Sequence, residues 1–338
     1  MTTTSPTPTR VVVTGAAGFI GSHLTDALLA RETEVIAIDR RSVHTDPVAA
    51  RNLADALINP HLSLHQADLA TDELDELISG AQVVFHLAAV PGVRDSWDER
   101  FPDYAASNVV ATQRLLAACE RAQVPRLVLA SSSSVYGQTS GPSKESDSTY
   151  PMSPYGATKL AAEHLCMAHA ARPDTSTSVV ALRYFTVYGP RQRSDMAISR
   201  VLAAVLSGVP VPLYGDGQQS REFTYVDDIV AATLAAAAMP EDVDAEIVNV
   251  GGGSSVSMLE LISLIGQITG RKVPLAMEAP RAGDVEATRA DLTLARVFLG
   301  YSPHIELREG IARQLDWMVK QPSPQMFSEP AVAEVVSR

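Results

Sequence analysis

Residues 10–21 read Arg-Val-Val-Val-Thr-Gly-Ala-Ala-Gly-Phe-Ile-Gly, an apolar run that leads directly into three glycines. The run from Arg10 to Val13 is typical of a buried strand, and the residues after the glycines predict a helix over 22–30. Glycines at this spacing permit a tight turn, a close backbone approach to a pyrophosphate and close packing of helix on strand. The stretch therefore predicts the first strand–turn–helix unit of a dinucleotide-binding α/β fold.

The end of the next predicted strand discriminates between two cofactors. That strand covers residues 34–39 and ends in Asp39, 24 residues after Gly15. A carboxylate at this position accepts hydrogen bonds from the adenosine ribose and repels a 2′-phosphate, so Asp39 favours NAD over NADP. Arg40 and Arg41 leave NADP open, because they could pair with that phosphate or could be ordinary loop charges.

Strand-like and helical stretches alternate along the first half of the chain. Further runs rich in Val, Ile and Leu predict strands over 62–66, 83–88, 126–131 and 178–183. These runs hardly alternate between apolar and polar residues, as expected of strands buried on both faces. The pattern predicts a Rossmann-type, doubly wound parallel sheet with helices on both sides.

The composition of the sequence changes after residue 186, where predicted loops rich in Pro, Gly and Arg surround one predicted helix. A helix predicted over 226–238 returns the chain to the first lobe. We therefore expect two interleaved domains and a loose tail. The expected ranges are a NAD-binding domain over 8–186 with 226–250, a smaller α/β substrate domain over 187–225 and 251–321, and the tail over 322–338.

Composition limits the possible partners. The chain has 338 residues and is 46% apolar, which is enough for one large core. Its net charge of -12 repels nucleic acid and anionic lipid, so we expect neither nucleic acid nor a membrane as partner. Two cysteines, Cys119 and Cys166, are too few for a disulfide framework and fit a reduced, cytoplasmic protein. No membrane span, export signal or metal site is expected.

A second chemical pattern lies at residues 153–159, which read Ser-Pro-Tyr-Gly-Ala-Thr-Lys. Ser153 and Pro154 are typical of a helix start, and Tyr155 and Lys159, four residues apart, share one helix face. Tyrosine has an ordinary pKa of about 10 and is a poor base at neutral pH unless a cation such as Lys159 lies beside it. The pair could take a proton from a sugar hydroxyl, although Tyr-x-x-x-Lys also arises on ordinary helices.

Six segments together carry a family pattern. They are 14–21, 86–89 (His-Leu-Ala-Ala), 131–137 (Ser-Ser-Ser-Ser-Val-Tyr-Gly), 153–159, 183–190 (Arg-Tyr-Phe-Thr-Val-Tyr-Gly-Pro) and 221–228 (Arg-Glu-Phe-Thr-Tyr-Val-Asp-Asp). With these segments the chain resembles the extended short-chain dehydrogenases/reductases that act on nucleotide sugars, over roughly residues 10–320. The resemblance implies Ser132, Tyr155 and Lys159 as catalytic residues, with Ser133 as the rival for the serine.

The resemblance also implies a tightly bound NAD that is regenerated in every cycle. The residues implied to contact it lie in the glycine turn, after the second, third and fourth strands, and on the catalytic helix. They are Gly15, Gly18, Phe19, Ile20, Gly21, Asp39, Arg40, Asp68, Leu69, Leu87, Ala88, Ala89, Tyr155 and Lys159.

The neighbours of Ser132 separate the reactions within this family. Sugar 4,6-dehydratases carry an Asp-Glu pair where this chain has Ser133 and Ser134, and nucleotide-glucuronate decarboxylases usually carry Glu in place of Ser134. Both of these reactions are therefore disfavoured. The remaining expectation is a 4-epimerase, which oxidises carbon 4 to a ketone and returns hydride to the opposite face.

The segments 91–94 and 186–197 resemble the UDP-glucuronate 4-epimerases in particular. The resemblance implies that Arg193 binds the sugar carboxylate, helped by hydroxyls of Ser133, Ser134 and Thr186. A 4-keto glucuronate is a β-keto acid, so a held carboxylate protects it from losing carbon dioxide. Arg193 could instead form a loop salt bridge or contact the diphosphate. At two positions, Arg191 and Ser194, these epimerases more often carry a bulky aromatic residue and a proline.

The resemblance extends to the nucleotide end of the substrate. It implies that Tyr214 stacks on uracil, unless that ring is ordinary packing, that Arg221 and Arg281 bind the diphosphate, and that Asp284 binds the ribose. Arg94 completes the implied substrate-binding set, and the partner it implies is a UDP-sugar.

Other readings stay open. UDP-glucose/UDP-galactose 4-epimerisation is the main alternative, and a nucleotide-sugar reductase or a non-catalytic NAD-binding regulator are others. A homodimer formed by helices over 108–121 and 155–170 is also implied by the resemblance.

Overall fold

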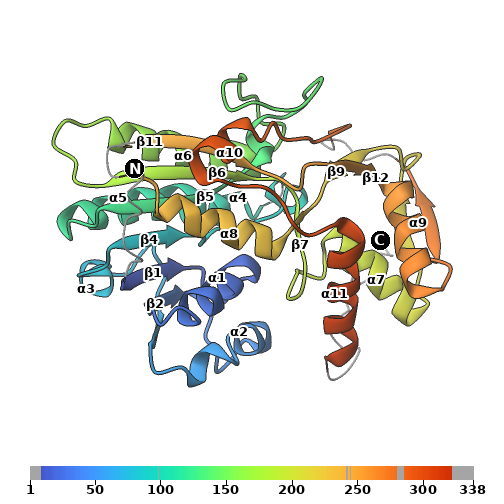
Figure 1. Cartoon of the computed structure of the whole chain (residues 1–338), viewed down its shortest axis with the longest axis horizontal. Helices are drawn as coiled ribbons and strands as arrows, with labels where there is room; N and C mark the ends of the chain where they lie inside the picture. Colours follow the sequence, from blue (N-terminus) through green and yellow to red (C-terminus); the bar gives the residue numbers. More distant parts are fainter. Residues whose placement is uncertain (1–8, 98, 241–242, 244, 280–284, 322–338) are drawn as a thin grey trace, which may run out of the picture.

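The computed structural model describes residues 9–97, 99–240, 243, 245–279 and 285–321. Its centre is a seven-stranded parallel sheet in the order β11-β6-β5-β4-β1-β2-β3 (Figure 1). The strands are β1 (Arg10–Thr14), β2 (Glu34–Asp39), β3 (Leu62–Gln66), β4 (Val83–His86), β5 (Arg126–Ser132), β6 (Ser178–Tyr184) and β11 (Ala245–Val250). The Rossmann-type parallel sheet expected from the sequence is therefore confirmed.

Six of these strands begin and end within two residues of their predicted limits. The strand β11 was not predicted, because Glu246 and Asn249 interrupt a short apolar run. It pairs in parallel with β6 at one edge of the sheet.

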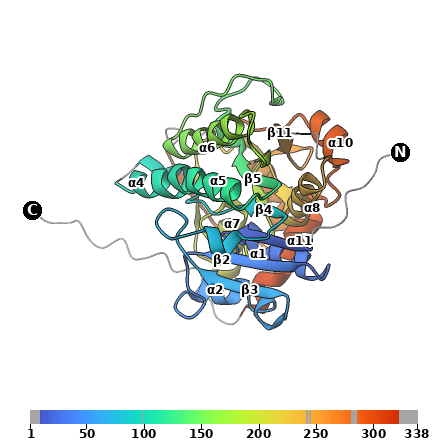
Figure 2. The ribbon, with the colours of Figure 1, turned by 90° about the vertical axis from the view of Figure 1, so that its left-hand side faces the viewer.

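Alternate residues of each strand pack on opposite faces of the sheet, as the two-residue period of a strand requires. Val11 and Val13 lie in one apolar cluster, whereas Val12 lies in another. The first cluster is covered by α1 (Phe19–Leu29) and α8 (Val226–Ala237). The second is covered by α5 (Ala111–Arg121) and α6 (Pro154–Ala170), which lie side by side in Figure 2, and by α3 (Asp75–Ile78).

The helix predicted over 108–121 has a different start. Regular α-helix begins at Ala111, and π-helical turns over Ala105–Val110 join it to α4 (Phe101–Tyr104). Asn108 therefore lies inside a continuous helical segment and does not begin it.

The remaining elements gather beyond the carboxyl ends of the sheet strands, on the right of Figure 1. Three small two-stranded sheets pair β7 (Val187–Tyr188) with β10 (Thr224–Tyr225), β8 (Val211–Tyr214) with β13 (Leu275–Glu278), and β9 (Ser220–Glu222) with β12 (Ser255–Ser257). The accompanying helices are α7 (Ala197–Ser207), α9 (Met258–Thr269) and α11 (Leu307–Lys320). Two further helices, α2 (Pro47–Asn52) and α10 (Thr293–Leu299), flank the main sheet.

Residue 8, with which the first expected domain begins, and the expected tail over 322–338 lie outside the described residues. Within the described part of the chain, every helix is too short or too polar to span a membrane.

Candidate active site

The glycine turn between β1 and α1 leaves no room for side chains. Gly15 has a φ of +68°, and a Cβ on it would lie 2.7 Å from the backbone nitrogen of Ala88. A Cβ on Gly18 would lie 2.9 Å from the carbonyl oxygen of Gly15, and one on Gly21 would lie 2.1 Å from the same oxygen. Helix α1 starts at Phe19, so its first N–H groups face the turn as donors for an anionic group.

Asp39 joins the end of β2 to this turn. Its Oδ2 accepts a hydrogen bond from the backbone nitrogen of Ala17 at 3.0 Å, and its Oδ1 accepts from the backbone nitrogen of Arg41 at 2.9 Å. Arg41 also forms an ion pair with the Asp39 carboxylate. Arg40 points elsewhere, and donates to the hydroxyl of Ser107 at 3.2 Å.

The other predicted cofactor residues follow neighbouring strands. Asp68 and Leu69 come after β3, where the Leu69 carbonyl accepts from Arg114 at 3.0 Å. The segment Leu87–Ala89 comes after β4, and the backbone nitrogen of Ala88 donates to the Thr14 hydroxyl at 3.2 Å beside the glycine turn. The fold thus brings these loops together beyond the carboxyl ends of β1 to β4, and the strand order reverses between β1 and β4.

A buried chain of hydrogen bonds joins the ends of β1 and β4 to the helical segment 105–121, and sequence reasoning did not predict it. Thr112 donates to the carbonyl of Asn108 at 2.8 Å, so its oxygen accepts from Nε2–H of His86 at 2.9 Å. Nδ1 of His86 then accepts from the Thr14 hydroxyl at 2.8 Å. Burial lowers the pKa of His86 to about 3, and the imidazole is neutral. The only sequence signal was a polar residue at the end of a buried strand.

Ser132, Tyr155 and Lys159 meet where β5 ends and α6 begins. The Ser153 hydroxyl caps α6 by accepting from the backbone nitrogen of Gly156 at 3.0 Å, which sets the start of the helix. Lys159 is buried, and its Nζ donates to the carbonyl of Ala130 on β5 at 2.6 Å. Tyr155 shares a hydrogen bond with Ser132 and meets the ring of Tyr104 edge to face, with 6.3 Å between centroids.

The electrostatics of this group depend on three neighbours. Burial raises the pKa of Tyr155, while the Ser132 hydrogen bond and then the charge of Arg193 act in the opposite direction. Burial lowers the pKa of Lys159 to about 8, against the negative charge of Glu163. The lysine is thus mostly charged at neutral pH and loses its proton as the pH rises through about 8.

Glu163 belongs to a second buried network that sequence reasoning missed. It lies one helical turn after Lys159 on α6 and forms an ion pair with Arg183 of β6 at 2.8 Å. The hydroxyl of Ser131 donates to the same carboxylate. Arg183 also lies over the ring of Tyr136, 4.7 Å from its centroid. The spacing of Glu163 from Lys159 was visible in the sequence, but its partner came from a strand 20 residues away.

The predicted substrate residues lie on loops around the catalytic group. A Cβ on Gly92 would lie 3.4 Å from Nη2 of Arg193 and 3.5 Å from the hydroxyl of Tyr104, whose ring packs on Tyr155. Nε of Arg193 donates to Oδ1 of Asp195 at 2.9 Å. Ser133 and Ser134 form the 3-10 turn that directly follows Ser132.

The described residues predicted for the nucleotide end come from a 3-10 turn at Arg94, from the end of β8 at Tyr214 and from β9 at Arg221, and Thr186, predicted for the sugar carboxylate, lies beyond β6. The guanidinium of Arg94 lies over the ring of Tyr214, 4.9 Å from its centroid. Arg221 lies on β9 and donates to the carbonyl of Ser220 at 2.8 Å. Thr186 follows β6, where its carbonyl accepts from the backbone nitrogen of Thr224 at 2.9 Å. The last two predicted residues, Arg281 and Asp284, lie outside the described residues.

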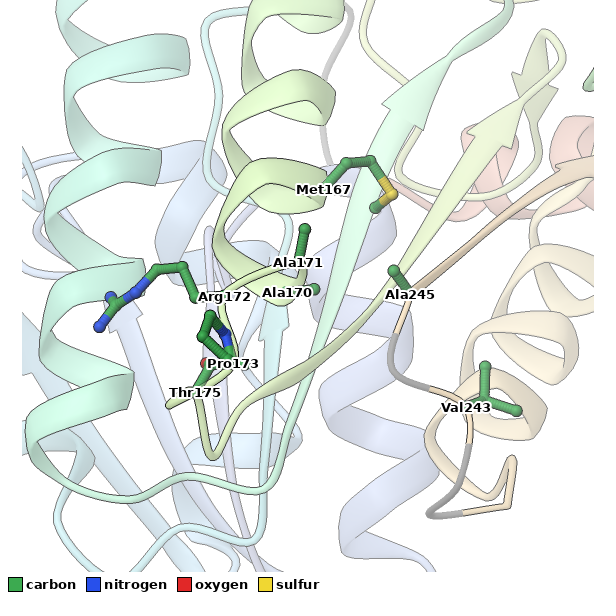
Figure 3. Close-up of a pocket in the computed structure, with 8 residues that line it drawn as sticks. All are labelled: Met167, Ala170, Ala171, Arg172, Pro173, Thr175, Val243 and Ala245. Atoms are coloured by element: carbon green, nitrogen blue, oxygen red, sulfur yellow. The ribbon is translucent and has the colours of Figure 1, made fainter.

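A cavity of about 610 Å³ (Figure 3) lies far from Ser132, Tyr155 and Lys159. It is bounded by the end of α6 at Ala170, by Thr175 before β6 and by Ala245 at the start of β11. Tyr155 and Ala170 are about 22 Å apart along the helix. The cavity therefore lies at the amino ends of the strands and is separate from the catalytic group.

Metal-ligand groups are not found among the described residues. His61 and His65 are four residues apart, a spacing that places two ligands together on a helix. Here His61 directly precedes β3 and His65 lies within it, and the extended backbone separates the two residues by about 13 Å.

Residues 11–251 match the family model described as the NAD dependent epimerase/dehydratase family. The chain belongs to this family. As an NAD-dependent family member it needs a site for NAD, and the tight glycine turn beside the Asp39 carboxylate fits one.

Three relatives illustrate the similarity. The chain is 42% identical to an uncharacterised UDP-glucose epimerase, YtcB, of Bacillus subtilis, over 91% of this chain and 98% of that protein. The structure of MoeE5 in complex with UDP-glucuronic acid and NAD is 46% identical, with a TM-score of 0.85 over 92% of this chain and 99% of the other. The structure of UDP-glucuronic acid 4-epimerase from Bacillus cereus in complex with UDP-glucuronic acid and NAD is 38% identical, with a TM-score of 0.87 over 92% and 99%.

Proposed function

We propose that this epimerase/dehydratase family member is an NAD-dependent UDP-sugar 4-epimerase that interconverts UDP-glucuronate and UDP-galacturonate. The observation that carries the proposal is the position of the Arg193 guanidinium beside Gly92 and Tyr104, the ring that packs on Tyr155, with hydroxyls rather than carboxylates in the turn after Ser132. A guanidinium close to the acid/base suits a sugar with a carboxylate on carbon 5. The structures with UDP-glucuronic acid bound support the same substrate.

In the proposed reaction, Tyr155 takes the proton from the hydroxyl on carbon 4 and later returns it. Ser132 shares a hydrogen bond with Tyr155 and orients the same hydroxyl. The positive charge of Lys159 favours the phenolate form of Tyr155. When bound, NAD supplies the acceptor and donor of the hydride that leaves carbon 4 and returns to its opposite face.

Arg193 has a second task once carbon 4 is a ketone. A β-keto acid loses carbon dioxide when the bond between its carboxylate carbon and the neighbouring carbon aligns with the π system of the ketone. A bidentate Arg–carboxylate pair holds the carboxylate in one plane and preserves its charge. We propose that Arg193, with the hydroxyls of Ser133, Ser134 and Thr186, prevents decarboxylation in this way.

The remaining assignments stay proposals. We propose that the cofactor residues named above contact NAD, and that Arg94, Tyr214, Arg221, Arg281 and Asp284 bind the UDP moiety. We also propose the domain division over 8–186 with 226–250 against 187–225 with 251–321. The gathering of the small sheets beyond the carboxyl ends of the main strands supports that division.

We further propose that the enzyme is a homodimer in the cytoplasm, built through α5 and α6. Both helices lie on one face of the sheet, and Val110 at the start of α5 is 46% exposed. The buried free thiols of Cys119 and Cys166 suit a reducing compartment. Light scattering on the wild type and on Val110→Asp tests the dimer. We expect a dimeric wild type and weaker dimerisation of the variant. Cell fractionation tests the location.

The decisive experiment follows UDP-glucuronate and UDP-glucose in parallel by proton NMR, without added cofactor. We expect conversion of the glucuronate to its galacto epimer without any pentose product. In Arg193→Ala, we expect the preference for the acidic sugar to collapse about a hundredfold and a decarboxylated product to appear. Arg172→Ala is the matched control, because Arg172 pairs with Asp174 two residues away but lies at the far end of α6. An unchanged preference in Arg193→Ala would contradict the carboxylate role.

UDP-glucose/UDP-galactose 4-epimerisation is the second candidate. One contact favours it: Arg193 already has a carboxylate partner in Asp195, so its charge is balanced without an acidic sugar. The naming of the Bacillus subtilis relative agrees with this alternative. Turnover of UDP-glucose alone in the NMR experiment would establish it.

A further inference from the structure

The loop that carries Arg193 is held from two sides. It leaves β7 at Gly189 and reaches α7 at Ala197, and it is the connection on which Arg193 stands. One side is contacted by α11 and the other by α1, the helix of the glycine turn. These helices lie about 120 and 165 residues away in the sequence.

On one side the contact is an amide of α11. Gln314 is fully buried, and its Oε1 accepts from the backbone nitrogen of Gly189 at 3.0 Å. Its Nε2 donates to Oε1 of Gln192 at 2.8 Å and to the hydroxyl of Ser199 at 3.0 Å. Both N–H groups and the oxygen of this amide are therefore satisfied in the protein interior, where an unmade bond would be costly.

Gln192 connects the Gln314 side chain to the main chain of the loop. Its Nε2 donates to the carbonyl of Val187 at 2.9 Å, and its Oε1 also accepts from Ser199 at 2.9 Å. Gln192 is the residue directly before Arg193, so its side chain and the Gly189 nitrogen fix both ends of the turn that leads to the guanidinium.

On the other side the contacts come from α1. Nε2–H of His23 donates to the carbonyl of Pro190 at 2.9 Å, and Nη1 of Arg191 donates to Oδ2 of Asp26 at 2.6 Å. Arg191 has a φ of +64°, a left-handed conformation that is uncommon for residues with a Cβ. The ion pair between Arg191 and Asp26 is only partly exposed, with Arg191 14% exposed, and it stabilises Arg191 in this conformation.

We propose that Gln314 and Asp26 are positioning residues that set the preference of this enzyme for an acidic sugar. They hold the loop in one register, and through it the guanidinium of Arg193 relative to Tyr155. The inference rests on the proposed function, since it needs a carboxylate for Arg193 to recognise. A bidentate pair is sensitive to misplacement of about 1 Å, which can cost up to about a hundredfold in rate.

The test compares Gln314→Met with Ile311→Ala. Methionine keeps the length of the side chain but leaves the Gly189 nitrogen and the Gln192 oxygen without this partner. Ile311 lies on the same helix and is fully buried, but it packs in the apolar core. Both variants lower Tm, so stability alone does not distinguish them. The discriminating measurement is the ratio of kcat/KM for UDP-glucuronate to that for UDP-glucose, with retained NAD measured on the same samples.

We expect the ratio to fall about tenfold or more in Gln314→Met, with a decarboxylated product, and to stay within about twofold in Ile311→Ala. Asp26→Asn keeps the shape of the side chain and weakens only the ion pair, so its ratio should fall about threefold. This second variant tests the hold on the loop even if Gln314→Met folds poorly. Ratios that stay at the wild-type value in both variants would overturn the inference.

Arg193→Ala separates this inference from the proposed function. If Arg193→Ala loses the preference while Gln314→Met and Asp26→Asn keep it, the carboxylate contact stands and the positioning role is wrong. If Arg193→Ala itself keeps the preference, the proposed function is wrong.

Discussion

The proposed catalytic corner, where Ser132, Tyr155 and Lys159 meet, and the loop that carries Arg193 differ in how their side chains are held. The corner is built from β5 and α6, which follow one another in the chain, and Lys159 is buried against the backbone of β5. Arg193 is one-third exposed, and its ion-pair partner, Asp195, is two residues away. If the proposed roles hold, the main sheet sets the chemistry, whereas the recognition of the sugar depends on how distant helices hold one loop.

The two regions also differ in charge. At the corner, the Glu163–Arg183 pair is almost completely buried, with side-chain exposures of 2% and 4%. In the loop, Asp195 is 58% exposed. Water screens the second pair and not the first, so removing one partner should have very different consequences.

The largest effect is expected from Tyr155→Phe, which removes the acid/base and keeps the ring. Epimerisation should fall about a thousandfold or more, while the fold and the retained NAD stay unchanged. Tyr104→Phe is the control, because that ring packs on Tyr155 but its hydroxyl only donates to the carbonyls of Pro91 and Gly92. NMR of the sugar nucleotides measures both. Equal losses in the two variants would remove the distinction between the corner and its surroundings.

Next in size is Glu163→Gln, which should lower the free energy of unfolding by about 3 kcal/mol because it leaves the charge of Arg183 buried. Asp195→Asn in the loop should cost less than about 1 kcal/mol. Urea unfolding of the two variants compares the regions directly. Similar losses would show that burial does not separate them.

Glu163→Gln should also change how kcat/KM depends on pH. Lys159 is charged below its pKa of about 8, so kcat/KM should fall as the pH rises through that value. Glu163 raises the pKa of Lys159, so Glu163→Gln should move this alkaline limb to lower pH. A limb that stays in place would show that another group causes it.

A smaller effect is expected from Asp39→Asn. The amide keeps an acceptor for the Ala17 nitrogen but loses the charge that favours NAD over NADP, so we expect about tenfold weaker retention of NAD. Asp46→Asn is a matched control. Asp46 lies 4.0 Å from Arg41 and caps α2, and asparagine caps helices equally well. The NAD content of the purified variants decides, and equal content would contradict the role of Asp39.

The last effect concerns His86, and it appears only on acidification. The folded pKa of about 3 lies below the ordinary value of 6.5, so the unfolded chain binds a proton in this window and the folded chain does not. Stability is therefore complete above pH 6.5 and falls as the pH drops, with a slope approaching about 1.4 kcal/mol per pH unit. His86→Gln should lack this contribution in unfolding curves at pH 7.5 and 5. His65→Gln, which changes an exposed histidine, should keep the wild-type slope.

Local patterns in the sequence determined the main sheet and the catalytic corner. A strand followed by Gly15, Gly18 and Gly21 has few alternatives, because a Cβ at any of these positions would lie only 2.1 to 2.9 Å from a backbone atom. Tyr155 and Lys159 share a helix face by their spacing alone. Periodicity and spacing are visible within a few residues, so the sequence predicts them without the rest of the molecule.

Only the tertiary structure decided which distant residues support these sites. The edge strand β11, the hydrogen-bonded chain through His86, the Arg183 partner of Glu163 and the contact of Gln314 with the loop before Arg193 all join segments far apart in the chain. A buried Gln or Glu has no local signature, because its partner is set by how helices pack on the sheet. The physical reason is that burial makes such polar groups costly unless paired, and pairing is a property of the folded chain as a whole.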